Sequence, residues 1–291
     1  MPKRLSLSQL RAVEAVDRLG NFSLAARDIG VSQPSVSTRV QALESQYGVR
    51  LFHRNGHEVE ATPLLKEILP SIRSVLAVTE DIETLLDDQH ALNVGQLAIG
   101  YSTYQIAVPY ISRYMKTYPD IRVEARAMAS HDLLPELESG QLDVCFITAR
   151  EIPSHLVGHE ICEARIVLAV PRDHPYAGRA SIGWEEAVAY PLVQREKSSG
   201  TRRIFEASAR LARVEPNTIL GVGSWGSIVT MVKLGLGLGV AMDVEILPSD
   251  ELVGVEISGS GLRARQYAVC LPQMQSVRAV SRFLDLISGR P

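Results

Sequence analysis

Residues 21–43 read NFSLAARDIGVSQPSVSTRVQAL, and this stretch decides the fold of the N-terminal part of the chain. Ser23 is a good N-cap for a first short helix, which Gly30 is expected to end. Ser32 is then expected to cap a second helix, with Pro34 in its first turn, where the missing N–H has no cost. The stretch therefore predicts two helices separated by a tight break.

The second helix is expected to have one apolar and one polar face. Val36, Val40 and Leu43 recur at helical spacing and should face inward, and residues 7–19 supply a third, supporting helix. The hydroxyl, amide and guanidinium groups of the polar face suit base edges and phosphates in a major groove. A helix pair around a glycine is also compatible with packing alone. The contacts predicted for DNA on this helix are Ser32, Gln33, Pro34, Ser35, Ser37, Thr38 and Arg39.

Residues 49–62 (VRLFHRNGHEVEAT) predict a β-hairpin wing. Leu51 and Phe52 are its apolar anchors, and Asn55-Gly56 is a typical hairpin turn. Arg50 and Arg54 are expected to contact the DNA backbone beside the groove. Residues 1–57 hold eight Lys/Arg against four Asp/Glu, about +4, although the whole chain has a net charge of −3. This charge is modest, so one copy is expected to bind DNA weakly and a dimer or larger assembly is needed.

The run FSLAARDIGVSQPSVSTRVQALESQYGVRLFHR resembles the N-terminal signature of LysR-type transcriptional regulators. The matching elements are Ala25-Ala26, Ser32-Gln33-Pro34, Ser37, Leu43-Glu44 and Leu51-Phe52-x-Arg54. The resemblance implies a winged helix-turn-helix DNA-binding domain, here residues 1–62. One element departs from the pattern: family members usually carry Leu-Thr-x-x-Gly after the wing, and Ala61-Thr62-Pro63-Leu64-Leu65 lacks the glycine.

Residues 63–90 predict a long linker helix. Thr62-Pro63 provides a cap and a first-turn proline, apolar residues follow at three- and four-residue spacing, and Pro70 should bend the helix. Its six acids against Lys66 and Arg73 make it unsuitable as a DNA surface. An amphipathic helix packed on its own domain is the alternative. The resemblance implies that such helices pair two chains, so that a dimer, or a tetramer of two dimers, reads half-sites roughly 34 Å apart.

From residue 91 to residue 291, strand-like and helix-like segments alternate, which predicts an α/β domain with a parallel sheet covered by helices. The chain as a whole is thus expected to be α/β with an all-α N-terminal part. The resemblance implies a two-lobed effector domain like the periplasmic binding proteins, with crossovers near residues 162–165 and 263–267. Lobe I is expected at about 91–163 and 267–291, and lobe II at about 164–266.

Four loops are expected at the carboxyl ends of strands, where ligands bind in such sheets. Each offers hydroxyls or backbone N–H groups at a helix start, a combination that favours a small anion as inducer. A simple N-cap is the alternative for each Ser or Thr taken singly. The predicted effector-binding residues are Ser102, Thr103, Tyr104, Thr148, Arg150, Ser198, Ser199, Thr201, Arg202, Ser224 and Trp225. The stretches VPRDHPYA, SGTRRIFEASARLA and QYAVCLP more loosely resemble the branch associated with aminoethylphosphonate catabolism, which suggests a phosphonate.

Other functional classes find less support. The first twenty residues lack the continuous apolar run of a signal peptide and no segment is apolar enough to span a membrane, so the protein is expected in the cytoplasm, not as an exported solute-binding protein. No catalytic motif or metal-spaced cluster appears, so neither an enzyme nor a cofactor or metal is expected.

Cys145, Cys162 and Cys270 are expected to be structural thiols, with redox sensing as the alternative. The expected partners are double-stranded promoter DNA, an anionic small molecule, a second copy of the chain and RNA polymerase.

Overall fold

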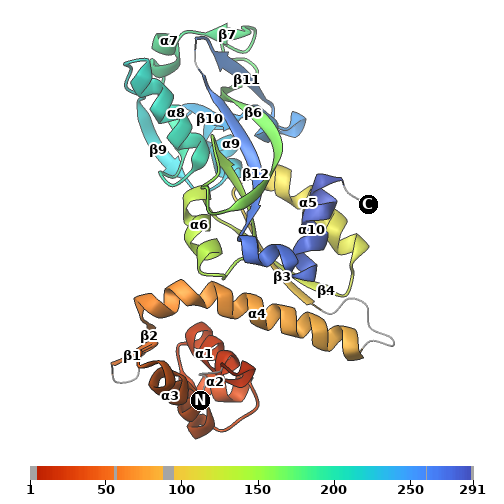
Figure 1. The fold of residues 1–291 in the computed structure, drawn as a ribbon. Coiled ribbons are helices and arrows are strands. Elements are labelled where there is room, and N and C mark those ends of the chain that lie inside the picture. Colours follow the sequence, from red (N-terminus) through yellow and green to blue (C-terminus); the bar gives the residue numbers. More distant parts are fainter. Residues whose placement is uncertain (1–4, 56–57, 88–94, 260, 290–291) are drawn as a thin grey trace. The chain divides into compact units, whose positions relative to one another are not determined.

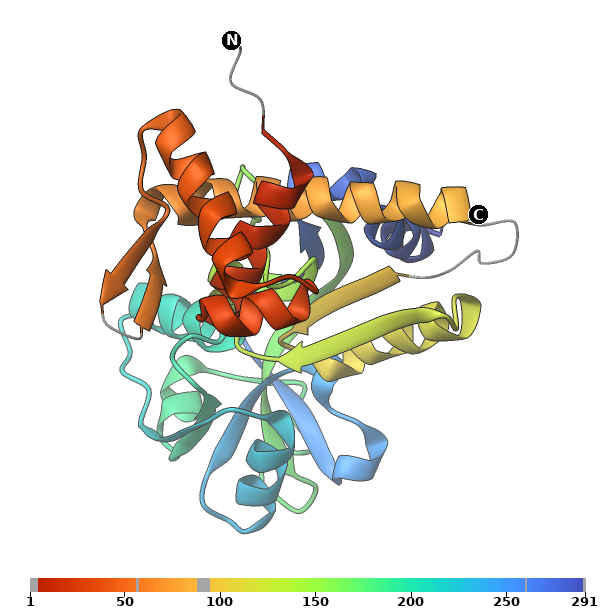
Figure 2. The same ribbon diagram turned by 90° about the horizontal axis from the view of Figure 1, so that it is seen from below.

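We describe the protein from a computed structural model, which covers residues 5–55, 58–87, 95–259 and 261–289 (Figures 1 and 2). The chain forms two compact units, one built mainly from the first 95 residues and one mainly from the remainder. Among the residues that are described, no helix is both long enough and apolar enough to cross a membrane.

Three helices form the core of the N-terminal unit: α1 (Leu7–Leu19), α2 (Phe22–Asp28) and α3 (Gln33–Tyr47). Ser6 and Gln9 form a capping box at the start of α1. Val13 and Val16 of α1, Ala25 of α2 and Val40 of α3 are fully buried against one another's helices. The predicted helix–break–helix is therefore confirmed, including a third helix at residues 7–19.

The N-cap of α2 differs from the prediction. Asn21, not Ser23, caps this helix, because its Oδ1 accepts hydrogen bonds from the backbone N–H groups of Ser23 (2.8 Å) and Leu24 (3.1 Å). Ser23 lies within the first turn, where its hydroxyl is too far along the helix to cap it. Ser32 does occupy the N-cap position of α3, although its side chain makes no capping hydrogen bond there.

The wing consists of β1 (Phe52–Asn55) paired antiparallel with β2 (Glu58–Ala61). Gly56 and His57 are outside the described residues, so the predicted Asn55-Gly56 turn is not described either. The wing is fixed at its base by the buried carboxylate of Glu44, whose Oε1 accepts from the N–H of Leu51 at 2.8 Å and from that of Phe52 at 3.4 Å. A single buried side chain thus ties the end of α3 to the first strand of the wing.

Helix α4 (Pro63–Asp87) begins at the predicted cap, where Thr62 Oγ1 accepts from the N–H of Leu65 at 3.3 Å. The helix continues through Pro70. Its first half is packed within the same chain, since Leu65, Leu69, Ile72 and Leu76 join the buried core of the N-terminal unit. In this half the helix packs on its own domain, which is one of the two interpretations that the sequence allows. Beyond it, Ile82 is 51% exposed.

The second unit is built on one ten-stranded sheet with the main order β4-β3-β5-β12-β6-β10-β8-β9, extended by β11 beside β6 and by β7 beside β11 (Figure 1). We call the part with β3, β4, β5, α5, α6 and α10 lobe I, and the part with β7 to β11 and α7 to α9 lobe II. Strands β6 and β12 run through both lobes. The bounds are β3 (Gly95–Tyr101), α5 (Tyr104–Thr117), β4 (Ile121–Ala127), α6 (Ser130–Glu138), β5 (Val144–Ala149), β6 (Val157–Pro171), β7 (Ser181–Ile182), α7 (Trp184–Val188), β8 (Leu192–Arg195), α8 (Gly200–Leu211), β9 (Thr218–Val222), α9 (Trp225–Lys233), β10 (Leu238–Met242), β11 (Leu252–Ile257), β12 (Arg263–Cys270) and α10 (Arg278–Ser288), with 3-10 turns η1 (Asp243–Glu245), η2 (Pro248–Asp250) and η3 (Pro272–Ser276).

The sheet is parallel in part, as predicted, because β3 pairs parallel with β5 and β8 pairs parallel with β9 and β10, but as a whole it is mixed. Strand β12 is antiparallel to β5 and β6, and β6 is antiparallel to β10 and β11. The two crossover strands enter the second lobe in one direction and return in the other, so the sheet must be mixed. The register of β12 against β6 shifts between Gln266 and Tyr267, which places an irregularity at the crossover itself. The strand β11 and the first half of β6 were not predicted, because VGHEICE shows no regular alternation of apolar residues.

Candidate functional site

The predicted DNA-contacting residues lie at the start of α3 and at the base of the wing. Ser32, Gln33, Pro34 and Thr38 are exposed, and Ser35, Ser37 and Arg39 are half-buried. The Arg50 side chain is 77% exposed and lies 3.8 Å from Glu44 Oε2. The side chain of Arg54 lies outside what the structure describes. This arrangement leaves an amide, hydroxyls and a cation accessible along one helix face and its neighbouring strand.

In lobe I, the ends of β3 and β5 bring two predicted hydroxyls together. Ser102 Oγ lies 3.4 Å from Thr148 Oγ1, and the backbone N–H of Ser102 donates to the carbonyl of Phe146 at 3.0 Å. Thr148 is buried, and its N–H donates to Ser130 Oγ at the start of α6 (3.0 Å). Parallel pairing of β3 with β5 explains this proximity, because the carboxyl ends of parallel neighbours meet at one edge.

Gln266 of the crossover strand β12 joins the two lobes. Its Nε2 donates to Thr148 Oγ1 in lobe I at 2.7 Å and contacts Met242 Sδ in lobe II at 3.0 Å. The side chain is almost fully buried, with 1% of its surface exposed. A single amide group thus spans the junction between the lobes.

On the lobe II side, Glu245 and Arg195 complete a closed series of contacts. Glu245 Oε2 accepts from the N–H of Met242 at 2.9 Å, and its Oε1 lies 3.8 Å from Arg195 Nη1. Arg195 Nη1 in turn donates to the carbonyl oxygen of Ser102 at 3.4 Å. We call this set of residues the inter-lobe ring: Ser102, Thr148, Gln266, Met242, Glu245 and Arg195.

Burial shifts the pKa of the carboxyl group in the inter-lobe ring, that of Glu245. Desolvation raises the pKa of the Glu245 carboxyl, although the N–H of Met242 and the Arg195 guanidinium both act to lower it. Arg195 is itself paired with Glu196 through two contacts of 3.1 and 3.2 Å. The Arg195 cation is therefore already paired with the carboxylate of Glu196, and burial disfavours the ionised form of Glu245.

The start of α8 is pressed against the same junction. Ser199 and Thr201 are buried, and a Cβ added to Gly200 would overlap the carbonyl oxygen of Thr148. Ser198 Oγ donates to Asp132 Oδ2 of α6 at 2.8 Å. Thr103, the N-cap of α5, is buried, and the next residue, Tyr104, is exposed. The structure therefore brings Ser102, Thr103, Thr148, Ser198, Ser199 and Thr201 to one place.

Four other predicted effector residues make contacts elsewhere. Arg150 donates to Ser208 Oγ on α8 at 3.1 Å, and Ser224 caps α9 and contacts Ser227. Trp225 is buried in a lobe II core cluster, where its Nε1 donates to Asp250 at 3.0 Å. Arg202 donates to the carbonyl of Arg195 and pairs with Glu206 at 2.7 Å.

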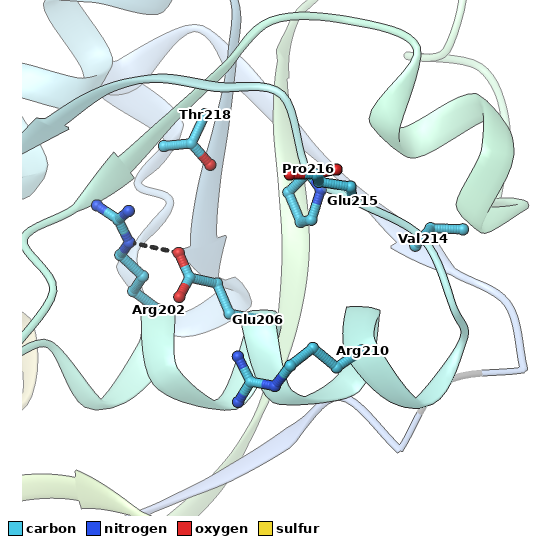
Figure 3. Close-up of a pocket in the computed structure, with 7 residues that line it drawn as sticks. All are labelled: Arg202, Glu206, Arg210, Val214, Glu215, Pro216 and Thr218. Carbon is cyan, nitrogen blue, oxygen red and sulfur yellow. Dashed lines mark hydrogen bonds and ion pairs between the residues drawn. The ribbon is translucent and has the colours of Figure 1, made fainter.

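Arg202 also borders a groove of about 430 Å³ along α8 (Figure 3). The Arg202 and Arg210 side chains lie on either side of Glu206 in this groove, so positive and negative groups alternate along it. The residues lining the groove are Arg202, Glu206, Arg210, Val214, Glu215, Pro216 and Thr218. None of these residues belongs to the inter-lobe ring.

Two family models match the chain. Residues 7–64 match the model "Bacterial regulatory helix-turn-helix protein, lysR family", and residues 90–290 match "LysR substrate binding domain". The chain belongs to the LysR family. It is a DNA-binding transcriptional regulator with an effector-binding domain, and not an enzyme.

Individual LysR-family proteins are similar over most of the chain. The uncharacterized HTH-type transcriptional regulator YnfL of Escherichia coli is 27% identical over 81% of this chain and 82% of its own length. A full-length OxyR variant from Pseudomonas aeruginosa has a TM-score of 0.77 at 22% identity, covering 98% of this chain and 95% of that one. The regulatory domain of CcmR from Synechocystis, solved in complex with 2-PG, has a TM-score of 0.60 at 22% identity and covers 67% of this chain and 96% of that one.

Sequence reasoning missed four of the six residues in the inter-lobe ring of this LysR-family regulator. Gln266, Met242, Glu245 and Arg195 were not among the predicted residues. One signal was present, because a glutamine within the strand-like run RARQYAVC is unusual among buried apolar neighbours and needs hydrogen-bonding partners. Glu245 gave no comparable signal, since an acidic residue after a strand normally indicates an exposed turn.

No group of three or more His, Cys, Asp or Glu side chains suited to hold a metal ion occurs among the described residues. Burial raises the pKa of all three thiols: Cys270 to about 11, Cys145 further, and the half-buried Cys162 in the same direction. Thiols with a raised pKa are poor nucleophiles at neutral pH, because the thiolate is the reactive form.

Proposed function

We propose that this LysR-family protein binds promoter DNA through α3 and the wing and responds to a small anionic metabolite bound at the inter-lobe ring. The observation that carries the proposal is the ring itself, which joins polar groups of both lobes in a closed series of contacts. A ligand that replaces some of these contacts changes how the lobes are held together. Such a ligand shifts the balance between conformations by its difference in affinity for them.

The preference for an anion is supported by the helix starts around the ring. The first-turn N–H groups of α5 and α8 have no partner within their own helices, and they carry the positive end of the helix dipole. Ser199 and Thr103 occupy the two N-cap positions without making side-chain capping bonds. Their hydroxyls and the nearby N–H groups are the kind of donors that bind an oxyanion.

A phosphonate is our specific candidate for the anion. A tetrahedral oxyanion accepts several N–H and O–H hydrogen bonds at once, which fits a site with Ser102, Thr148, Ser199 and Thr201 close together. The solved CcmR domain was obtained in complex with 2-PG, and this supports placing a small ligand in a domain of this fold.

We further propose that the protein acts in the cytoplasm as a dimer or a tetramer of two dimers, with RNA polymerase as a partner at the promoter. The net charge of about +4 on residues 1–57 is small for one DNA-binding copy. Val75 and Ile82 of α4 are 45% and 51% exposed, and they offer an apolar strip for a second α4. Such pairing would place two α3 helices on successive major grooves roughly 34 Å apart.

The test combines calorimetry and footprinting on the full chain. 2-Aminoethylphosphonate, inorganic phosphate, sulfate and a series of small carboxylates are titrated into the protein and into Ser102→Ala and Thr148→Val variants. We expect binding of at least one anion, weakened at least tenfold in both variants, together with a changed footprint or DNA bend. Ser227→Ala, which removes a half-buried lobe II hydroxyl on α9, is the control. If the anion bound equally to all four proteins, its site would lie outside the inter-lobe ring. If the DNA footprint were unchanged at saturating ligand, ligand binding would not be coupled to DNA binding.

A further inference from the structure

Two buried side-chain oxygens at the junction of the lobes accept no hydrogen bond from any protein group described. They are Oε1 of Gln266 and Oε1 of Gln105, the latter at the start of α5. Both amides are anchored on the same short segment of lobe II, because Gln266 Nε2 contacts Met242 Sδ and Gln105 Nε2 donates to the carbonyl of Glu245 at 2.9 Å. Both amides with an unused acceptor therefore contact the same four-residue segment, Met242 to Glu245.

The orientation of each amide is set by a partner that can only accept, because the Thr148 hydroxyl beside Gln266 can donate or accept and fits either orientation. A backbone carbonyl only accepts hydrogen bonds, and a thioether sulfur is likewise an acceptor. Rotating Gln105 by half a turn would set its oxygen against the Glu245 carbonyl oxygen, and rotating Gln266 would set its oxygen against Met242 Sδ. The described orientation avoids both repulsions, so what remains unused at each position is an acceptor and not a donor.

A third buried amide oxygen, Oε1 of Gln194, does not indicate a missing hydrogen-bond donor. Its Nε2 contacts the hydroxyl of Thr218 at 2.6 Å, and a hydroxyl can donate as well as accept. Either orientation of Gln194 is therefore satisfied equally well. This residue is a matched control, because it is a fully buried glutamine in the same domain but lies outside the inter-lobe ring.

We propose that the ligand of the inter-lobe ring is a small zwitterion, whose anionic group faces the helix starts and whose ammonium group donates to Gln266 and Gln105. This proposal rests on the proposed function and names the ligand class for the same site. An unpaired buried acceptor is unfavourable, and a ligand that donates to it removes the penalty. A ligand with acceptors alone leaves both amide oxygens unsatisfied.

An ammonium group suits the two acceptors better than a neutral hydroxyl. It has three N–H donors and can donate to both amide oxygens at once, whereas a hydroxyl has one donor. It would lie beside the segment from Met242 to Glu245, which both amides contact.

The test compares matched pairs of ligands by calorimetry on the full chain. 2-Aminoethylphosphonate is compared with ethylphosphonate, and 3-aminopropanoate with propanoate, because each pair differs by one amino group. We expect the amino compound of at least one pair to bind tenfold or more tightly than its partner. In Gln266→Met and in Gln105→Met this ratio should fall to about twofold, since Met retains the volume without the acceptor. In Gln194→Met the ratio should stay as in the parent.

Folding is checked for every variant by its melting temperature and by DNA binding without ligand, and two independent glutamines keep the test valid if one variant is unstable. If the compounds without an amino group bind as tightly as the amino compounds, and Thr148→Val weakens both, the zwitterion inference is wrong while the anion site stands. If no compound binds, or if Thr148→Val has no effect on binding, the proposed function of the ring fails and the inference fails with it.

Discussion

The backbone of Gly200 is packed against the carbonyl oxygen of Thr148, so closely that an added Cβ would overlap that oxygen. Gly200 begins α8 in lobe II, and Thr148 lies at the end of β5 in lobe I. The two lobes therefore approach each other backbone to backbone at this point. No side chain lies between the two backbones, so none can rotate to relieve this contact.

Gly200→Ala is expected to separate the start of α8 from β5. Overpacking of this kind costs about 1–3 kcal/mol, and the affected contact joins the lobes. We expect a lower melting temperature for the effector domain and loss of the ligand response, with DNA binding in the absence of ligand retained. The control is Gly226→Ala in α9, where nothing lies within 4 Å of the added Cβ. A Gly200→Ala protein that responds to ligand as the parent does would show that this contact does not couple the lobes.

The sequence predicted those parts of the molecule that depend on neighbours along the chain. Gly30, Ser32 and Pro34 act on the residues beside them, and the predicted break and start of α3 are confirmed. Local sequence patterns also predicted the regions where the helices of lobes I and II begin. What brings Ser102 to Arg195 is pairing between distant strands, and no local pattern encodes which strands those are.

Glu44 illustrates the same limit within a motif. The residue was recognised as part of the family signature, but a glutamate in the last turn of a helix ordinarily indicates an exposed position. Its carboxylate is in fact buried and accepts from the N–H groups of Leu51 and Phe52. The motif therefore pointed to the right residue, and only the fold supplied its structural role.

Arg50→Ala is expected to weaken binding to specific and non-specific DNA alike. Arg50 is highly exposed at the base of the wing, and its distance to Glu44 leaves its guanidinium accessible to a phosphate. Loss of one phosphate contact should reduce the slope of log K against log salt by about 1 per site. The measurement is a series of binding titrations at several salt concentrations. Lys116→Ala, which removes an exposed cation of α5, should leave the slope unchanged, and an unchanged slope for Arg50→Ala would remove this residue from the interface.

Gln33→Ala is expected to act on specificity. Gln33 is exposed at the first position of α3, where an amide can contact a base edge. We expect binding to the operator to weaken by about 1–3 kcal/mol while non-specific binding and the salt slope stay the same. Equal losses on operator and random DNA would assign Gln33 to backbone contacts instead.

Glu245→Gln is expected to make the effector domain less sensitive to pH. Burial raises the pKa of this carboxyl above the ordinary value of 4.5, so its contribution to stability is complete below about pH 4.5 and is lost as the pH rises through the raised value. The melting temperature of the variant should therefore improve relative to the parent from pH 4 to pH 8.

Glu186→Gln is the comparison of opposite sign. Arg179 and the N–H of Gly183 lower the pKa of Glu186, so its contribution is present above pH 4.5 and is lost as the pH falls. The melting temperature of the Glu186→Gln protein should fall below that of the parent at neutral pH. If both variants shifted in the same direction with pH, the buried state of Glu245 would not be the cause.

The cysteines are expected to react slowly with thiol reagents and to be dispensable for regulation. Burial raises the pKa of Cys145, Cys162 and Cys270, so little thiolate is present at neutral pH. In the native protein, labelling by 5,5′-dithiobis(2-nitrobenzoate) should be slowest at Cys145, which is fully buried, and fastest at the half-buried Cys162, though slower there than for a free thiol. Cys162→Ser should leave DNA binding and its response to ligand unchanged in the presence and absence of peroxide. A peroxide-dependent change in the footprint of the parent that is abolished in Cys162→Ser would instead establish redox sensing, the alternative left open by the sequence.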